Sequence, residues 1–147
     1  MNSQLNDKVT MFEKVLIGLG CPKLSKSNVF KVDECSDVYF SRVILKEKDT
    51  ILLTLEFSKS GIDIHLDGSS EVFSWGNEFI ENNLDEVLDV MKIILTSEIR
   101  VESYGKAMKK FCFIDADKKI TLLEFKVFES LFINPFRKAV KTFPPIL

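Results

Sequence analysis

Between Asp37 and Trp75 the chain alternates apolar with polar side chains in four short runs, and turn-forming residues separate each run from the next. Alternation with a period of two places the apolar side chains of a strand on one face, and short polar turns join antiparallel neighbours. The segment therefore predicts four consecutive strands of an antiparallel sheet with one buried face. The four runs are residues 37–46, 50–57, 62–67 and 72–75.

One helix is predicted on each side of these strands in the sequence. Residues 5–19 place apolar side chains three and four positions apart, and Gly20 followed by Pro22 provides a stop. A second helix is predicted to begin at Asn83, because Asn83 and Glu86 have the spacing of a capping box. Its apolar stripe consists of Leu84, Val87, Leu88, Met91, Ile94 and Leu95.

The C-terminal third predicts further strands at residues 99–101, 111–114 and 120–125, with a polar hairpin turn before the last of these. Apolar side chains are again spaced as in a helix from Val127 onward, but Pro135 interrupts this pattern. The conformation of residues 126–147 is therefore left open. We therefore predict a single α+β domain over residues 1–147. It has an antiparallel sheet of about six to seven strands, an N-terminal helix and a central helix.

Composition narrows the class of protein. The chain of 147 residues is 46% hydrophobic and 29% charged, which is typical of one globular domain. Its start lacks the apolar core of a secretory signal, and its most apolar runs are much shorter than a membrane span. Cys21, Cys35 and Cys112 are widely spaced and odd in number, which indicates reduced thiols. These features predict a cytoplasmic protein that does not enter a membrane.

The sequence offers little for catalysis. It contains neither a nucleophile elbow nor a phosphate-binding glycine loop, and His65 is its only histidine. Asp63, His65 and Asp67 form the best metal-like cluster, because alternate residues of a strand project to one face. We predict a protein that is not an enzyme and holds no metal or cofactor. A metal-dependent hydrolase that uses these three residues is one alternative, and a structural or ligand-binding partner of another protein is a second.

Charge is distributed unevenly along the chain, although the formal net charge is only −2. Residues 63–102 carry 10 acidic and 2 basic side chains, whereas residues 103–147 carry 9 basic and 4 acidic ones. An acidic patch of this kind is suited to the rapid capture of a cationic partner. Direct binding of nucleic acid is not expected, because the lysines of the C-terminal third are dispersed. The predicted partner contacts are Asp63, Asp67, Glu71, Trp75, Glu78, Glu81, Asp85, Glu86 and Asp89.

Three other interpretations of these residues remain open. Asp85 and Glu86 fall in the first turn of the predicted central helix, where the helix dipole favours carboxylates whether or not a partner exists. The basic C-terminal residues could also fold against the acidic stretch and neutralise it. Trp75 has the alternative of being a core residue, since large aromatic side chains are usually well buried.

An N-terminal helix, a meander, an acidic capped helix and a final hairpin follow one another in this chain. This layout resembles the immunity proteins of bacterial polymorphic toxin and contact-dependent growth inhibition systems. The stretch 85–104, which runs into 109–119, is its most suggestive part. The resemblance implies stoichiometric inhibition of one cognate toxin domain, often a basic nuclease, whose active site is covered or whose conformation is blocked. That family has no shared binding residues, so the predicted contacts rest on the charge distribution.

Overall fold

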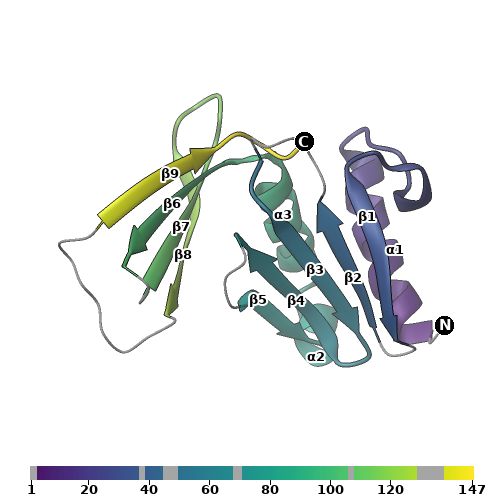
Figure 1. The fold of residues 1–147 in the computed structure, drawn as a ribbon. Helices are drawn as coiled ribbons and strands as arrows, with labels where there is room; N and C mark the ends of the chain where they lie inside the picture. Colours follow the sequence, from purple (N-terminus) through teal and green to yellow (C-terminus); the bar gives the residue numbers. More distant parts are fainter. Residues whose placement is uncertain (1–2, 37–38, 45–49, 68–70, 106–107, 129–137) are drawn as a thin grey trace. The chain divides into compact units, whose positions relative to one another are not determined.

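The computed structural model describes residues 3–36, 39–44, 50–67, 71–105, 108–128 and 138–147. These residues form three α-helices, one short 3-10 helix and nine β-strands (Figure 1). The chain divides into two compact units. The first unit comprises Met1–Glu47 and Leu52–Lys92, and the second comprises Lys48–Ile51 and Ile93–Leu147. None of the helices in the described part of the chain is long and apolar enough to cross a membrane.

Five strands of the first unit form one antiparallel sheet, in which each strand pairs with the next along the chain. This arrangement confirms the predicted antiparallel strands and adds one strand before them. The sequence analysis treated the additional segment as a polar linker, because it carries three charged side chains. The strands are β1 (Phe30–Ser36), β2 (Tyr39–Ile44), β3 (Leu53–Ser58), β4 (Gly61–Leu66) and β5 (Glu71–Gly76).

The core of the first unit lies between this sheet and helix α1 (Ser3–Gly18). Register pairs Phe57 of β3 with Ile62 of β4, and both side chains are fully buried on the same face. The ring of Phe12 on α1 lies 5.8 Å from that of Phe57 and 5.7 Å from that of Phe30, centroid to centroid. Each large apolar side chain buried in this way contributes roughly 1.5–3 kcal/mol. The 3-10 helix, η1, covers Leu24–Lys26.

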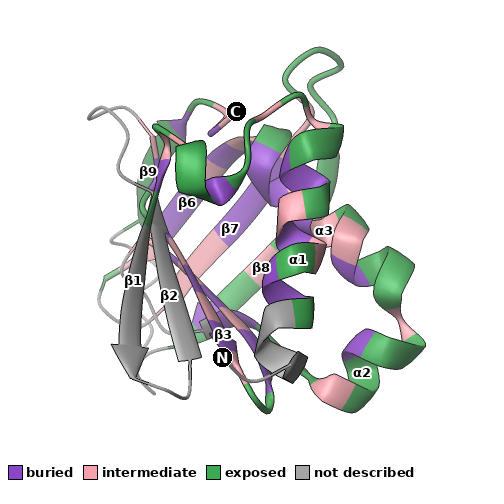
Figure 2. Ribbon diagram, turned by 90° about the vertical axis from the view of Figure 1, so that its right-hand side faces the viewer, coloured by how far each residue is buried: buried purple, intermediate pink, exposed green. Residues whose placement is uncertain are grey.

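Two further helices follow β5 without a long loop. They are α2 (Asn77–Asn82) and α3 (Leu84–Thr96), and most residues of α2 are exposed (Figure 2). The start of α3 agrees with the predicted one. Asn83 separates the helices: its Nδ2 donates to the carbonyl oxygen of Phe79, while its own carbonyl oxygen accepts from the backbone N–H of Val87. Asn83 therefore closes α2 as well as opening α3.

One glycine is required by the close pairing of β4 with β5. A Cβ atom at Gly61 would overlap the backbone carbonyl oxygen of Trp75. The two strands come together at this point, where Gly61 pairs with Gly76 and Ile62 with Trp75. Only a residue without a side chain allows this approach.

The strands of the second unit form a separate antiparallel sheet of four, in the order β8-β7-β6-β9. The α+β class with antiparallel strands is confirmed, but the strands belong to two sheets and exceed the predicted six to seven. The tail, whose conformation the sequence left open, begins in a strand, because Val127 belongs to β8. Residues 129–137 of the tail lie outside the described part. The four strands are β6 (Glu98–Tyr104), β7 (Met108–Ile114), β8 (Thr121–Phe128) and β9 (Lys138–Phe143).

Candidate partner-binding surface

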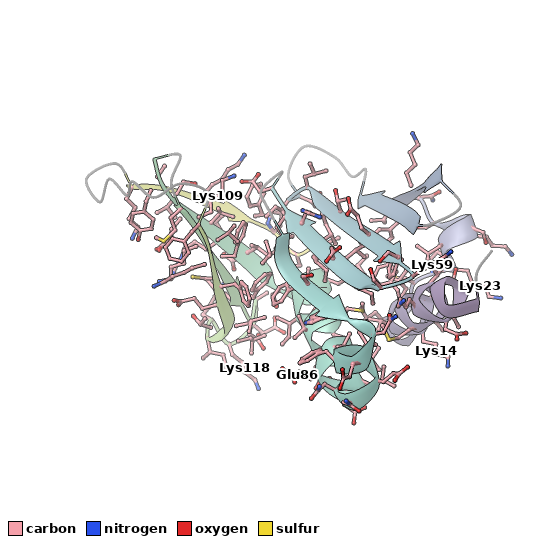
Figure 3. The ribbon with its side chains drawn as sticks, turned by 90° about the horizontal axis from the view of Figure 1, so that it is seen from below. Lys14, Lys23, Lys59, Glu86, Lys109 and Lys118 are labelled. Carbon is pink, nitrogen blue, oxygen red and sulfur yellow. The ribbon has the colours of Figure 1, made fainter. Side chains whose placement is uncertain are left out.

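The helices α2 and α3 carry five of the predicted contact residues, and all five side chains are exposed. Residues 77–91 include no lysine or arginine. Within the first unit, no described lysine or arginine forms an ion pair with these five carboxylates. Glu86 projects from α3, and Lys14 projects from α1 (Figure 3). The five residues, here called the acidic helix surface, are Glu78, Glu81, Asp85, Glu86 and Asp89.

Asp63, a predicted contact on a strand, does not join the acidic helix surface. Asp63 lies on the face of β4 opposite to Ile62 and Ile64, and those two residues face the core under α1. Its Oδ1 accepts a hydrogen bond of 2.6 Å from Ser74 Oγ. Asp67 is half-buried in the turn after β4, with a φ of 56°. The side chain of Glu71 lies outside the described residues, so its predicted contact stays a prediction.

Trp75 is half-buried in β5, and its ring lies 5.6 Å from that of Phe73 at an angle of 34°. Two other large apolar side chains, on the neighbouring helices, are more exposed to solvent. Phe79 on α2 is 39% exposed and Leu84 on α3 is 45% exposed. The anchors of a protein interface are often apolar side chains that a polar rim surrounds. Phe79 and Leu84 therefore fit that role better than Trp75 does.

A groove of about 540 Å³ lies between α1 and the pair formed by α2 and the start of α3. The sequence analysis missed it, because residues about 70 positions apart make up its two walls and Leu84 was assigned to the core. The α1 wall consists of Asp7, Lys8, Thr10, Met11 and Lys14, and the opposite wall of Asn77, Ile80, Glu81, Leu84 and Leu88.

Lys8 has an unusual environment in this groove, since the residue is only 7% exposed. Its Nζ donates to the carbonyl oxygen of Ser58 over 2.6 Å and to that of Lys59 over 3.2 Å. Burial lowers the pKa of the Lys8 ammonium below its ordinary value, and the charge of Asp7 opposes this shift. The two carbonyl oxygens take the place of the water that the ammonium loses.

The opposite wall of the groove also donates hydrogen bonds to the turn between β3 and β4, which contains the carbonyl partners of Lys8. Asn77 Nδ2 donates to the carbonyl oxygen of Lys59 over 2.6 Å, and the backbone N–H of Asn77 donates to that of Ser60 over 3.0 Å. Asn77 Oδ1 is buried and has no hydrogen-bond partner among the described residues. The turn between β3 and β4 is therefore held by one helix from each wall.

The metal-like cluster of the sequence is not assembled in the described residues. Among them, no three or more His, Cys, Asp or Glu side chains are placed to hold a metal ion together. His65 Nε2 lies 3.6 Å from Glu56 Oε2 on the neighbouring strand, and Asp63 is engaged by Ser74. This face of the sheet therefore has polar pairs in place of the proposed ligand set.

In the second unit, basic side chains surround Glu102, which is only 6% exposed. Its carboxylate lies 3.1 Å from Lys138 Nζ, 3.7 Å from Lys110 Nζ and 3.8 Å from Arg100 Nε. Burial raises the pKa of the Glu102 carboxyl, but the hydrogen bond from Lys138 and the charges of the three cations outweigh it. The pKa of Glu102 therefore lies below its ordinary value.

Lysines of the second unit also pair with two further carboxylates of their own sheet. Lys119 Nζ lies 2.8 Å from Glu98 Oε2, and Lys110 Nζ lies 3.2 Å from Glu124 Oε1. Glu98 and Glu102 belong to the acidic stretch of the sequence, so part of that stretch is neutralised by the C-terminal basic residues. Within the first unit, no described lysine or arginine forms an ion pair with the acidic helix surface.

Comparisons of the chain with protein-family models, with curated proteins and with solved structures find no match. A function can therefore be proposed only from the residues and their arrangement.

Proposed function

We propose that this protein is a cytoplasmic, non-catalytic immunity protein that binds and neutralises one cognate toxin domain. The observation that carries the proposal is the acidic helix surface, whose five exposed carboxylates form no ion pair with a described cation of the first unit. A charged surface left open in this way suits a partner of the opposite charge, such as a basic nuclease.

Two physical effects would act in succession when the toxin binds. The carboxylates attract lysine and arginine side chains over a distance, which raises the association rate and makes it sensitive to salt. Phe79 and Leu84 then lose water against the toxin and supply most of the affinity, as buried anchors do in other interfaces. The carboxylates would occupy the positions at which a nuclease binds the phosphates of its substrate.

Growth rescue tests this function directly. The C-terminal domain encoded by the adjacent upstream reading frame is expressed with and without this protein, and viability is scored. We expect lethality without the protein and growth with it. A domain that is harmless, or equally lethal in both cases, would contradict the immunity function.

The alternative function, a metal-dependent hydrolase, is tested on the purified protein. Elemental analysis of the purified protein measures bound metal per chain, and an Asp63→Asn variant is measured beside it. We expect metal well below one equivalent in both. One equivalent of metal in the wild type that is lost in the variant would favour the hydrolase instead.

A further inference from the structure

We propose that the groove between α1 and α2–α3 receives a cationic amphipathic segment of the protein partner. This inference rests on the proposed function and makes it specific, since it names the segment of the toxin that docks. Apolar side chains of the segment enter the groove, and its lysine and arginine side chains lie along the wall formed by α2 and α3.

The groove has the size and the lining for apolar side chains. Its volume of about 540 Å³ falls in the range of roughly 300–1,000 Å³ that is usual for ligand sites. Met11 on one wall and Ile80, Leu84 and Leu88 on the other supply apolar surface. Leu84 is 45% exposed although it begins the apolar stripe of α3, so covering it would remove apolar surface from water.

The charges of the two walls decide which amphipathic segment fits. Glu81 lines the α2–α3 wall, Glu78 and Asp85 are close to it in the sequence, and residues 77–91 bring no cation. On the α1 wall, the ammonium of Lys8 is directed into the β3–β4 turn by its two carbonyl partners. The other two charged residues of that wall, Asp7 and Lys14, are both exposed and have opposite charges, so they add no net charge to it. The α2–α3 wall is therefore the negative one, and it complements a cationic segment and repels an anionic one.

The walls are also held in place before any partner arrives. Lys8 and Asn77 approach the β3–β4 turn from opposite walls, and both donate to the carbonyl oxygen of Lys59. A groove whose walls share one anchor needs little rearrangement on binding, which reduces the ordering cost of association.

The experiment uses two fluorescein-labelled helical peptides and the full-length protein. Both peptides carry leucines at positions i, i+3, i+4 and i+7; one has lysine and the other glutamate on the polar face. Fluorescence anisotropy measures the affinity of each peptide at low and high salt. We expect the leucine–lysine peptide to bind at least about tenfold more tightly than the leucine–glutamate peptide. Equal affinities would overturn the cationic part of the proposal.

A substitution that fills the groove tests whether the peptide binds there. Thr10 is an exposed residue of the α1 wall, so Thr10→Trp places a large ring in the groove without changing a charge or the core. Ile17 is an exposed residue of the same helix that does not line the groove, so Ile17→Trp is the matched control. We expect Thr10→Trp to weaken binding of the leucine–lysine peptide about tenfold or more, and Ile17→Trp to leave it unchanged. Equal binding by the two variants would overturn the groove as the docking site.

Growth rescue separates this inference from the proposed function. Rescue by the wild type and by Ile17→Trp, with loss of rescue by Thr10→Trp, would support both. Rescue by all three proteins would retain the immunity function and overturn the groove. Failure of the wild type to rescue would overturn the immunity function, and the peptide measurements would still decide whether the groove takes a cationic segment.

Discussion

Lys8 Nζ on α1 donates a hydrogen bond of 2.6 Å to the carbonyl oxygen of Ser58, so a buried cation fastens the first helix to the end of β3. Fifty positions of sequence separate the two residues. Because Lys8 also lines the groove, the same side chain helps to hold the fold and to set the position of the α1 wall.

Replacement of Lys8 should therefore weaken the fold. Lys8→Met keeps most of the side-chain volume but removes the donor, and the carbonyl oxygen of Ser58 loses a charged hydrogen bond. We expect a loss of about 1–3 kcal/mol in the free energy of unfolding, measured by urea denaturation. Lys14→Met, at an exposed position of the same helix, is the control and should change little. Equal stability of the two variants would show that the bond to Ser58 contributes nothing.

Glu102 gives a prediction that depends on pH. A carboxyl group whose pKa is lowered on folding stabilises the fold above its ordinary pKa of 4.5, and this effect is lost as the pH falls through the lower folded-state value. Glu102→Gln should therefore be less stable than the wild type by about 1–3 kcal/mol at pH 7. The difference should shrink below pH 4.5.

The control for Glu102 is Glu124, which lies on β8, is exposed and pairs with Lys110. Exposed ion pairs contribute little, so Glu124→Gln should cost less than about 1 kcal/mol. Denaturation curves for the three proteins over a series of pH values provide the test. If the free energy of unfolding of Glu102→Gln stays below that of the wild type by the same amount down to low pH, the ionised carboxylate of Glu102 is not what stabilises the second unit.

Charge reversal on α3 tests the acidic helix surface. Asp85→Lys, Glu86→Lys and Asp89→Lys together should slow association with the toxin domain and flatten its salt dependence. Because Asp85 and Glu86 lie in the first turn of α3, reversing their charges should also lower the free energy of unfolding, by roughly 0.3–1 kcal/mol each. Asp89→Lys alone is matched by Asp117→Lys, which makes the same charge change at another exposed position. The association rate is measured by stopped flow at several salt concentrations. Asp89→Lys should lower this rate, and Asp117→Lys should not. Unchanged rates and salt slopes in the triple variant would rule out steering by this surface.

Gly61 should tolerate no side chain. Gly61→Ala forces a Cβ atom against the carbonyl oxygen of Trp75, and backbone atoms of a paired strand cannot move aside easily. We expect a loss of about 1–3 kcal/mol, the usual cost of overpacking. Gly18→Ala at the end of α1 meets no atom within 4 Å and should be neutral or stabilise slightly. Thermal denaturation of the two variants compares them directly, and a stable Gly61→Ala protein would argue against the close β4–β5 approach.

Local patterns in the sequence predicted the parts of the fold that bury one regular face. The alternation in β3 and β4 reappears as alternating buried and half-buried side chains, and α3 begins at the predicted position. β9 could not be recognised in this way. Five of its six side chains are exposed, so it has almost no apolar face to produce a periodic signal, and it forms by pairing with β6.

The candidate site was predictable only in part. The carboxylates of α2 and α3 were identified from charge alone, because a charged side chain on an amphipathic helix is nearly always exposed. The groove was not, since it depends on Met11 lying opposite Leu84, a relation between distant segments that no local pattern encodes. Asp63 was grouped with the helical acids by position in the sequence, whereas strand alternation turns it to the other face of the sheet.

Trp75 is the single tryptophan of the chain and lies in the first unit, half-buried beside Phe73. The emission of a partly shielded indole changes when water reaches it, so fluorescence follows the unfolding of the first unit alone. Far-UV circular dichroism follows the strands of both sheets at once. Superimposable denaturation curves from the two signals would show one cooperative transition, and separated curves would show that each sheet melts by itself. One aromatic ring thus makes the chain a spectroscopic reporter of its own domain organisation.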